Sequence, residues 1–156
     1  MRSSLKLGIA VFATAATMFG GSAFANAHGG GFGSQAAQPC PAGGTASVAT
    51  DAPTTMWPPN HKQHTYTFTY SGGTSGDMFT TTTTSSDGNG VVTADSGSPA
   101  TADATGSAST QSTLVSARPG TSKTGRTYTV AYTVSGSNSC SGSFTITVPH
   151  DRRHTH

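Results

Sequence analysis

The sequence predicts an all-β protein, folded as an Ig-like antiparallel β-sandwich of about seven short strands. Apolar and polar residues alternate with a period of two over 65–70, 127–134 and 144–148, as in strands that bury one face. Clusters of Gly, Pro, Asn and Asp interrupt the chain about every ten residues, which is the turn spacing of a sandwich. After residue 27, no segment has the apolar spacing of a helix.

The first residues predict a cleaved signal peptide over 1–25. Arg2 and Lys6 precede an uncharged apolar run over 7–19, and small-residue cleavage sites follow that end at Ala25 or Ala27. This order of a basic, an apolar and a small-residue region is typical of secretory signals. The apolar run is short for a membrane-spanning helix. We therefore expect a secreted or periplasmic protein with no membrane span in its mature form, and an uncleaved anchor is the alternative.

The mature chain is expected to have three parts. A flexible leader rich in Gly, Ala and Pro covers 26–44, the sandwich covers 45–151, and a basic tail with histidines covers 152–156. Leu114 is the one Leu after the signal and Ile146 the one Ile, so the core is expected to be thin. Intrinsic disorder competes with the sandwich at this composition, but period-two alternation and low charge favour strands.

Individual strands are predicted from local pattern. The threonine-rich run over 79–84 favours extended backbone because its residues are β-branched. The turn at 135–138 makes the last two strands a hairpin, and the Asp-Gly-Asn-Gly cluster at 87–90 predicts another hairpin turn. The small, polar stretch over 94–109 indicates a long loop or a weak edge strand before a strand over 110–117.

The two cysteines that follow the signal predict one disulfide. Cys40 and Cys140 are the smallest even number of cysteines, and such a pair forms a disulfide in the oxidising compartments that exported proteins enter. Closing a loop of about 100 residues contributes up to about 4–5 kcal/mol in the chain-entropy model. This cross-link would matter in a domain with a thin core.

The charge balance argues against nucleic-acid binding. Without Arg2 and Lys6, the chain balances six Lys and Arg against six Asp, and it contains no Glu. A neutral chain with no basic patch lacks the charge that neutralises phosphates.

Two end motifs resemble a known family. Residues 57–62 read Trp-Pro-Pro-Asn-His-Lys, and the closing part contains Gly-Arg-Thr-Tyr-Thr-Val at 125–130 and Phe-Thr-Ile-Thr-Val-Pro-His-Asp at 144–151. These segments are similar to bacterial extracellular Ig-like domains of the hyalin-repeat and cadherin-like kind, and the resemblance covers about residues 50–151. It implies an accessory module of a secreted or surface protein and no catalytic residues. The acidic, cysteine-containing loop expected of the family is replaced by Ser-Gly-Gly-Thr-Ser-Gly-Asp at 71–77.

Histidines are the candidate metal ligands, because neutral imidazole binds Zn, Cu and Ni. His61 and His64 would point to opposite faces of a strand, but on irregular backbone His61 could join the C-terminal groups. The alternative interpretation is a solvated tail with structural histidines, and hence no cofactor. The candidate ligand set is His61, His150, Asp151, His154 and His156.

A calcium site at 87–90 is the weaker cofactor hypothesis. The Asp-Gly-Asn-Gly cluster starts like a calcium loop, but Val91 follows where an oxygen ligand is needed and no Glu can close the site.

Trp57 is the candidate binding residue for sugar rings, which stack on aromatic side chains. The tyrosines at 66, 70, 128 and 132 lie on the apolar faces of their predicted strands, and we expect them in the core. Trp57, held before two prolines, is then expected to plug one end of the sandwich.

The sequence therefore predicts a non-enzymatic interaction or structural module of the cell envelope or medium, with an unknown protein or polysaccharide partner. No nucleophile elbow occurs, and carboxylate pairs for acid–base chemistry would need to come from six scattered Asp. Two alternatives remain: a secreted metal-binding protein that uses the C-terminal histidines, and a carbohydrate-binding module.

Overall fold

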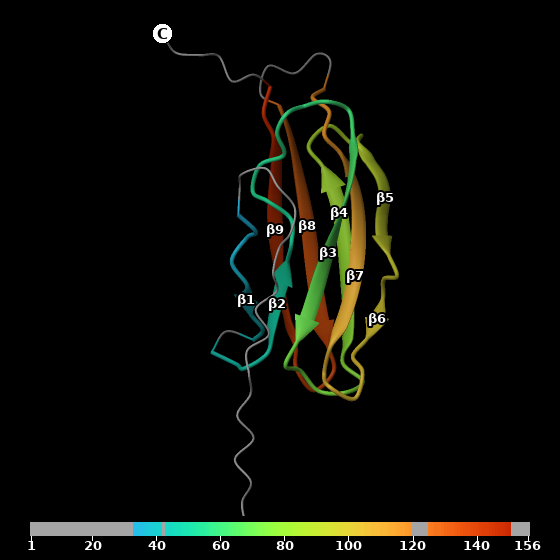
Figure 1. The fold of residues 1–156 in the computed structure, drawn as a ribbon. Coiled ribbons are helices and arrows are strands. Elements are labelled where there is room, and N and C mark those ends of the chain that lie inside the picture. Colours follow the sequence, from blue (N-terminus) through green and yellow to red (C-terminus); the bar gives the residue numbers. More distant parts are fainter. Residues whose placement is uncertain (1–32, 42, 120–124, 151–156) are drawn as a thin grey trace, which may run out of the picture.

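The fold is a sandwich of two antiparallel sheets, as the sequence predicts (Figure 1). The computed structural model describes residues 33–41, 43–119 and 125–150. One sheet has the strand order β1-β2-β3-β7-β5 and the other the order β6-β4-β8-β9. The strands are β1 (Gln38–Pro39), β2 (Ser47–Thr50), β3 (Gln63–Ser71), β4 (Met78–Ser85), β5 (Val91–Ser96), β6 (Ala100–Thr101), β7 (Ala108–Val115), β8 (Arg126–Ser135) and β9 (Cys140–Val148). The count exceeds the expected seven because β1 and β6 have two residues each, too few to show a period.

The core lies between the sheets and is rich in aromatic rings. Alternate residues of β3, β4, β8 and β9 point into it, and the rings of Phe68 and Phe144 meet across the sandwich with centroids 5.9 Å apart. These large side chains supply the apolar area that a chain with few Leu and Ile lacks. The expected core positions of Tyr70, Tyr128 and Tyr132 are confirmed, and Tyr66 is partly buried.

Hydroxyl groups also pair inside the sandwich. Thr81 of β4 and Thr110 of β7 face each other from opposite sheets, with their Oγ1 atoms 2.9 Å apart. Thr83 and Ser112 repeat this arrangement at 2.8 Å. Because each of these four hydroxyls has a partner, threonine and serine fill these core positions without leaving an unsatisfied polar group.

The N-terminal strands extend the sandwich beyond the expected boundary at residue 45. The predicted disulfide between Cys40 and Cys140 is present, with Cα atoms 5.4 Å apart. Gln38 of β1 donates its amide to the carbonyl of Ser143 at 2.8 Å and accepts from the Tyr132 hydroxyl at 2.8 Å. These bonds make residues from Gln38 onward part of the folded unit, although they fall within the segment assigned to the leader.

The segment after β2 crosses from one sheet to the other. Thr55 bridges Thr147 in parallel, and the Met56 amide donates to the Thr147 carbonyl at 2.8 Å. The crossing therefore covers part of the outer edge of β9.

The prediction of a hairpin turn at 87–90 is wrong. The turn follows β4, which pairs with β6 and β8, but leads into β5, which pairs with β7 in the other sheet. A turn cluster predicts that the chain reverses and does not specify which strand the next one joins. The hairpin of β8 and β9 is confirmed, with Arg126 opposite Val148 and Val134 opposite Cys140.

Candidate functional site

One end of the sandwich gathers loops that the sequence places far apart. Ser116, which follows β7, accepts the His61 amide on its carbonyl at 2.9 Å and donates its own amide to the Lys62 carbonyl at 2.8 Å. Its hydroxyl donates to the Pro58 carbonyl at 2.6 Å. We call residues 57–62, 86–90, 116–119, 125–126 and 150 the loop end. Ser116 is 1% exposed and had no signal in the sequence, because its role is to anchor backbone.

The exposed side chains of the loop end are an aromatic ring and cations. Trp57 is 39% exposed, and Lys62 and Arg118 are exposed in loops of the same end. Trp57 thus does not plug the sandwich as fully as expected. His61 has φ of 61°, in the left-handed region that non-glycine residues seldom adopt. The bond to Ser116 holds this conformation.

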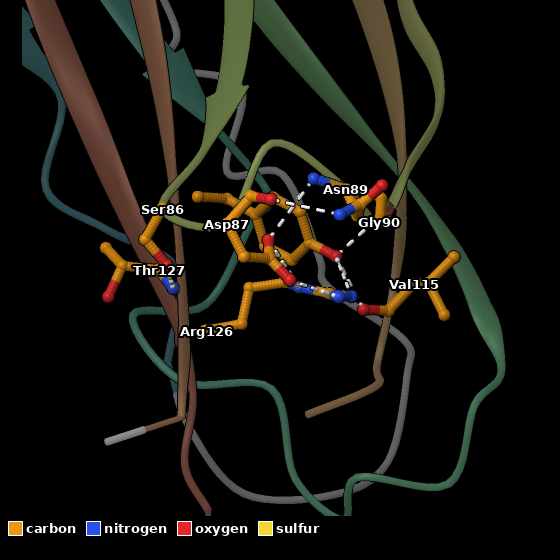
Figure 2. Close-up of polar contacts among 8 residues, drawn as sticks. Ser86, Asp87, Asn89, Gly90, Val115, Arg126 and Thr127 are labelled. Atoms are coloured by element: carbon orange, nitrogen blue, oxygen red, sulfur yellow. Dashed lines mark hydrogen bonds and ion pairs between the residues drawn. The ribbon is translucent and has the colours of Figure 1, made fainter. Parts of the chain in front are cut away.

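A buried arginine joins the loop end to the core (Figure 2). Arg126, the first residue of β8, is 6% exposed. Its guanidinium donates to both carboxylate oxygens of Asp87, with the Nη2 to Oδ2 bond at 2.6 Å. Its Nη1 donates to the Tyr128 hydroxyl at 3.2 Å, which in turn lies 2.9 Å from the Gly90 carbonyl and 2.8 Å from that of Val115. This network ties β4, β5, β7 and β8 together.

The network also fixes the charge of Asp87. Hydrogen bonds from Arg126 hold the pKa of Asp87 below its ordinary value, although burial acts in the opposite direction. Asp87 is therefore ionised at neutral pH and bound to an arginine. These contacts occupy the carboxylate that would begin a calcium loop, and the Asn89 side-chain amide donates to the Asp87 carbonyl at 3.0 Å.

A fully buried carboxylate anchors the opposite end. Asp77 is 1% exposed and accepts bonds from the Tyr70 hydroxyl at 2.8 Å, the Thr74 amide at 3.0 Å and the Ser137 amide at 2.7 Å. The side chain of Asn138 donates to it at 2.9 Å. These bonds, that of Asn138 first, lower the pKa of Asp77 far below its ordinary value. The turn before β4 is thus fastened to the β8–β9 turn.

The candidate metal ligands are only partly placed. His61 and His150 both belong to the loop end, since Arg118 donates to the His150 carbonyl at 3.1 Å and Ser116 binds His61. Within the described ranges, no group of three or more His, Cys, Asp or Glu could hold a metal ion. The remaining predicted ligands, Asp151, His154 and His156, lie outside the described residues, so the metal hypothesis stays a prediction.

The outer faces of both sheets carry hydroxyl side chains. A shallow groove of about 430 Å³ lies against the five-stranded sheet, lined by Thr67, Thr69, Ser109 and the carboxylate-bearing loop at Asp103. Apart from Asp95 of β5, the charged residues of the described ranges lie instead in loops or at strand ends: Asp51, Lys62, Asp77, Asp87, Asp103, Arg118 and Arg126. The outward residues of β3, β4, β8 and β9 include Thr65, Thr67, Thr69, Thr80, Thr82, Thr84, Thr127, Thr129, Thr133, Ser141, Ser143, Thr145 and Thr147.

Comparison with known proteins gives no match from which the site could be interpreted, so its geometry is the basis of the interpretation. No protein-family model matches the chain, and no curated protein or solved structure matches it significantly. Among residues 33–41, 43–119 and 125–150, no helix is long and apolar enough to cross a membrane.

Proposed function

We propose that this protein is a non-enzymatic, exported Ig-like module that binds a partner of the cell envelope or medium through its loop end. The observation that carries this proposal is the distribution of charge. Lys62 and Arg118 lie at the loop end, whereas the outward side chains of β3, β4, β8 and β9 include no Lys, Arg, Asp or Glu. Specific contacts to a partner are then made at an end, where charge and an exposed aromatic ring coincide.

The roles of the carboxylates support a non-enzymatic module. Asp51 accepts the Thr67 amide at 2.7 Å, and Asp103 accepts the Thr105 and Ser107 amides at 2.8 and 3.1 Å. Hydrogen bonds also lower the pKa of Asp103, led by that from the Thr105 hydroxyl, as other bonds do for the buried carboxylates described above. Asp77, Asp87 and Asp103 therefore remain ionised at neutral pH, so they cannot donate a proton as general acids. They stabilise loops.

The chemistry of the loop end favours an anionic partner. Trp57 offers an exposed ring, and Lys62 and Arg118 offer positive charge. Tryptophan and arginine are the residues that most often dominate binding energy at interfaces. An acidic envelope polysaccharide fits these groups, because a ring stacks on sugars and cations pair with carboxylate or phosphate.

Export is part of the proposal. The predicted signal peptide and the resemblance to bacterial extracellular Ig-like domains support it. The Cys40–Cys140 disulfide is compatible with an oxidising compartment.

The test is co-sedimentation of the purified, oxidised protein with isolated cell-envelope fragments of its source. We expect the wild type to sediment, and Trp57→Ala and the Lys62→Ala, Arg118→Ala double variant to stay in solution. Added salt should weaken binding, because it screens exposed charges. Met78→Ala is the matched control, since Met78 is an exposed apolar residue, 46% accessible, at the opposite end. A wild type that stays in solution, or equal losses in Met78→Ala and Trp57→Ala, would overturn the proposal.

A further inference from the structure

The turn between β4 and β5 places an asparagine directly before a glycine. A side-chain carboxamide can be attacked by the backbone nitrogen of the next residue, and a glycine carries no side chain to obstruct this approach. We infer that Asn89 is a site of spontaneous deamidation, with water as the co-reactant.

The structure distinguishes Asn89 from the other two described asparagines. The nitrogen that would attack Asn60 is that of His61, and its N–H donates to the Ser116 carbonyl at 2.9 Å. The carboxamide of Asn138 donates to Asp77 at 2.9 Å and to the Thr74 hydroxyl at 3.2 Å.

Asn89 has fewer restraints. Its side chain is exposed, and its side-chain nitrogen makes one bond, to the Asp87 carbonyl at 3.0 Å. The backbone N–H of Asn89 donates to the Asp87 carboxylate at 3.3 Å. Within the described residues, the N–H of Gly90 donates no hydrogen bond. The carboxamide at this site is therefore exposed, and no hydrogen bond holds the attacking nitrogen.

The reaction is balanced without any oxidant or reductant. The Gly90 nitrogen forms a bond to the Asn89 side-chain carbon, and the bond from that carbon to Nδ2 breaks. Ammonia leaves with the proton lost by the Gly90 nitrogen, and a five-membered succinimide remains. Water then opens the ring at either carbonyl, which gives aspartate or isoaspartate at position 89.

Packing explains why this reactive pair is present. Gly90 has φ of 89°, and a Cβ at this position would overlap the Arg126 guanidinium and the Tyr128 hydroxyl. The arginine network therefore requires glycine at position 90, which leaves Asn89 without protection from a following side chain.

Deamidation would weaken the contacts of this turn (Figure 2). The donor to the Asp87 carbonyl is lost, and a new negative charge appears beside Asp87. Isoaspartate also adds one carbon to the main chain just before Gly90, whose carbonyl accepts the Tyr128 hydroxyl at 2.9 Å and the Val115 amide at 3.0 Å. Both bonds would be displaced.

The experiment is incubation of the folded, oxidised protein at mildly alkaline pH, followed by peptide mass spectrometry and an isoaspartate assay. We expect Asn89 to convert several-fold faster than Asn60 and Asn138 in the same molecules. Asn89→Gln should abolish isoaspartate formation at position 89, because the longer side chain forms the ring poorly. An Asn89 that stays intact, or three asparagines that convert at equal rates, would overturn the inference.

Asn89→Asp separates the two effects on stability, because it adds the charge without lengthening the main chain. We expect the isoaspartate form, isolated by ion exchange, to melt below both Asn89→Asp and the unmodified protein. An isoaspartate form that melts with Asn89→Asp would contradict the displaced Gly90 carbonyl.

Discussion

The hydroxyl of Tyr70 donates a hydrogen bond to the carboxylate of Asp77 across 2.8 Å inside one end of the sandwich. The bond requires a neutral phenol and an ionised carboxyl group. Burial, followed by the bond to Asp77, raises the pKa of Tyr70 to about 12, and the pKa of Asp77 is lowered. Both shifts favour the bonded pair.

The pair predicts loss of stability at both extremes of pH. The folded pKa of Asp77 lies below its unfolded value, so its contribution is present above that value and is lost as the pH falls through the folded pKa. The folded pKa of Tyr70 lies above 10, so its contribution is present below pH 10 and is lost as the pH rises through about 12. Chemical denaturation across pH should therefore show both declines.

Variants assign these declines to their residues. Tyr70→Phe should reduce the alkaline decline, and Asp77→Asn should lower the melting temperature on the order of 10 °C and reduce the acid decline. Unchanged pH profiles in both variants would contradict this assignment.

The paired hydroxyls in the core predict non-additive mutations. Thr81→Val leaves the buried Thr110 hydroxyl without its partner at 2.9 Å and should cost about 1–3 kcal/mol. The double change of Thr81 and Thr110 to valine removes both polar groups and keeps their shape, so its stability should approach that of the wild type. Urea denaturation of the four proteins gives the coupling energy, and strictly additive losses would show that the hydroxyls do not interact.

The Arg126–Asp87 pair predicts a difference between two arginines of the same end. Arg126→Ala leaves a partly buried carboxylate without its cation and should cost about 2–4 kcal/mol. Arg118→Ala is the control, since Arg118 is exposed, and should change stability by less than about 1 kcal/mol. Guanidinium is unsuitable for this comparison because it screens charge, so the measurement is urea denaturation. Equal losses would mean that the buried network adds little.

The disulfide predicts a strong dependence on redox conditions. Cys40 and Cys140 are 100 residues apart, and opening this loop should cost up to about 4–5 kcal/mol. We expect a fall in melting temperature on the order of 10–20 °C on reduction. The double change of both cysteines to serine should melt with the reduced protein, and a variant as stable as the oxidised wild type would contradict the prediction.

The metal hypothesis predicts stabilisation by Zn²⁺ or Cu²⁺, with Ca²⁺ and EDTA as comparisons. A ligand at about 1,000 times its Kd adds roughly 4 kcal/mol, which is a shift on the order of 10–20 °C in melting temperature. Truncation after Asp151 should remove this shift, because it deletes His154 and His156. If no ion shifts the melting temperature, the histidines are not ligands.

Local patterns predicted much of the fold. Alternation over 127–134 and 144–148 identified the β8–β9 hairpin and the buried aromatic faces, because apolar residues at alternate positions mark the buried face of a strand. The strand β2 was missed since Ser47–Thr50 is short and has no aromatic residue. The destination of the β4–β5 turn depends on pairing between distant strands, which no local pattern encodes.

The loop end was only partly predictable for the same reason. Trp57 and His61 belong to a conspicuous motif, whereas Ser116 became visible only through its contacts with that motif. Arg126 lies 39 residues from Asp87, and Ser137 lies 60 residues from Asp77. The residues of these pairs are of types that are common on protein surfaces, so the sequence does not indicate that the fold brings them together.

The position of the Cys40–Cys140 bond also sets the path of mechanical load. If the protein is pulled between its N-terminal leader and its C-terminal tail, force enters at Cys40 and passes through the sulfur atoms directly to Cys140. The strands from β2 to β8 lie on a closed loop and bear no tension, so only β1 and β9 can be peeled away. While the disulfide is intact, the sandwich would therefore lengthen under force by no more than the chain of β1 and β9, and the strands from β2 to β8 would extend only after reduction.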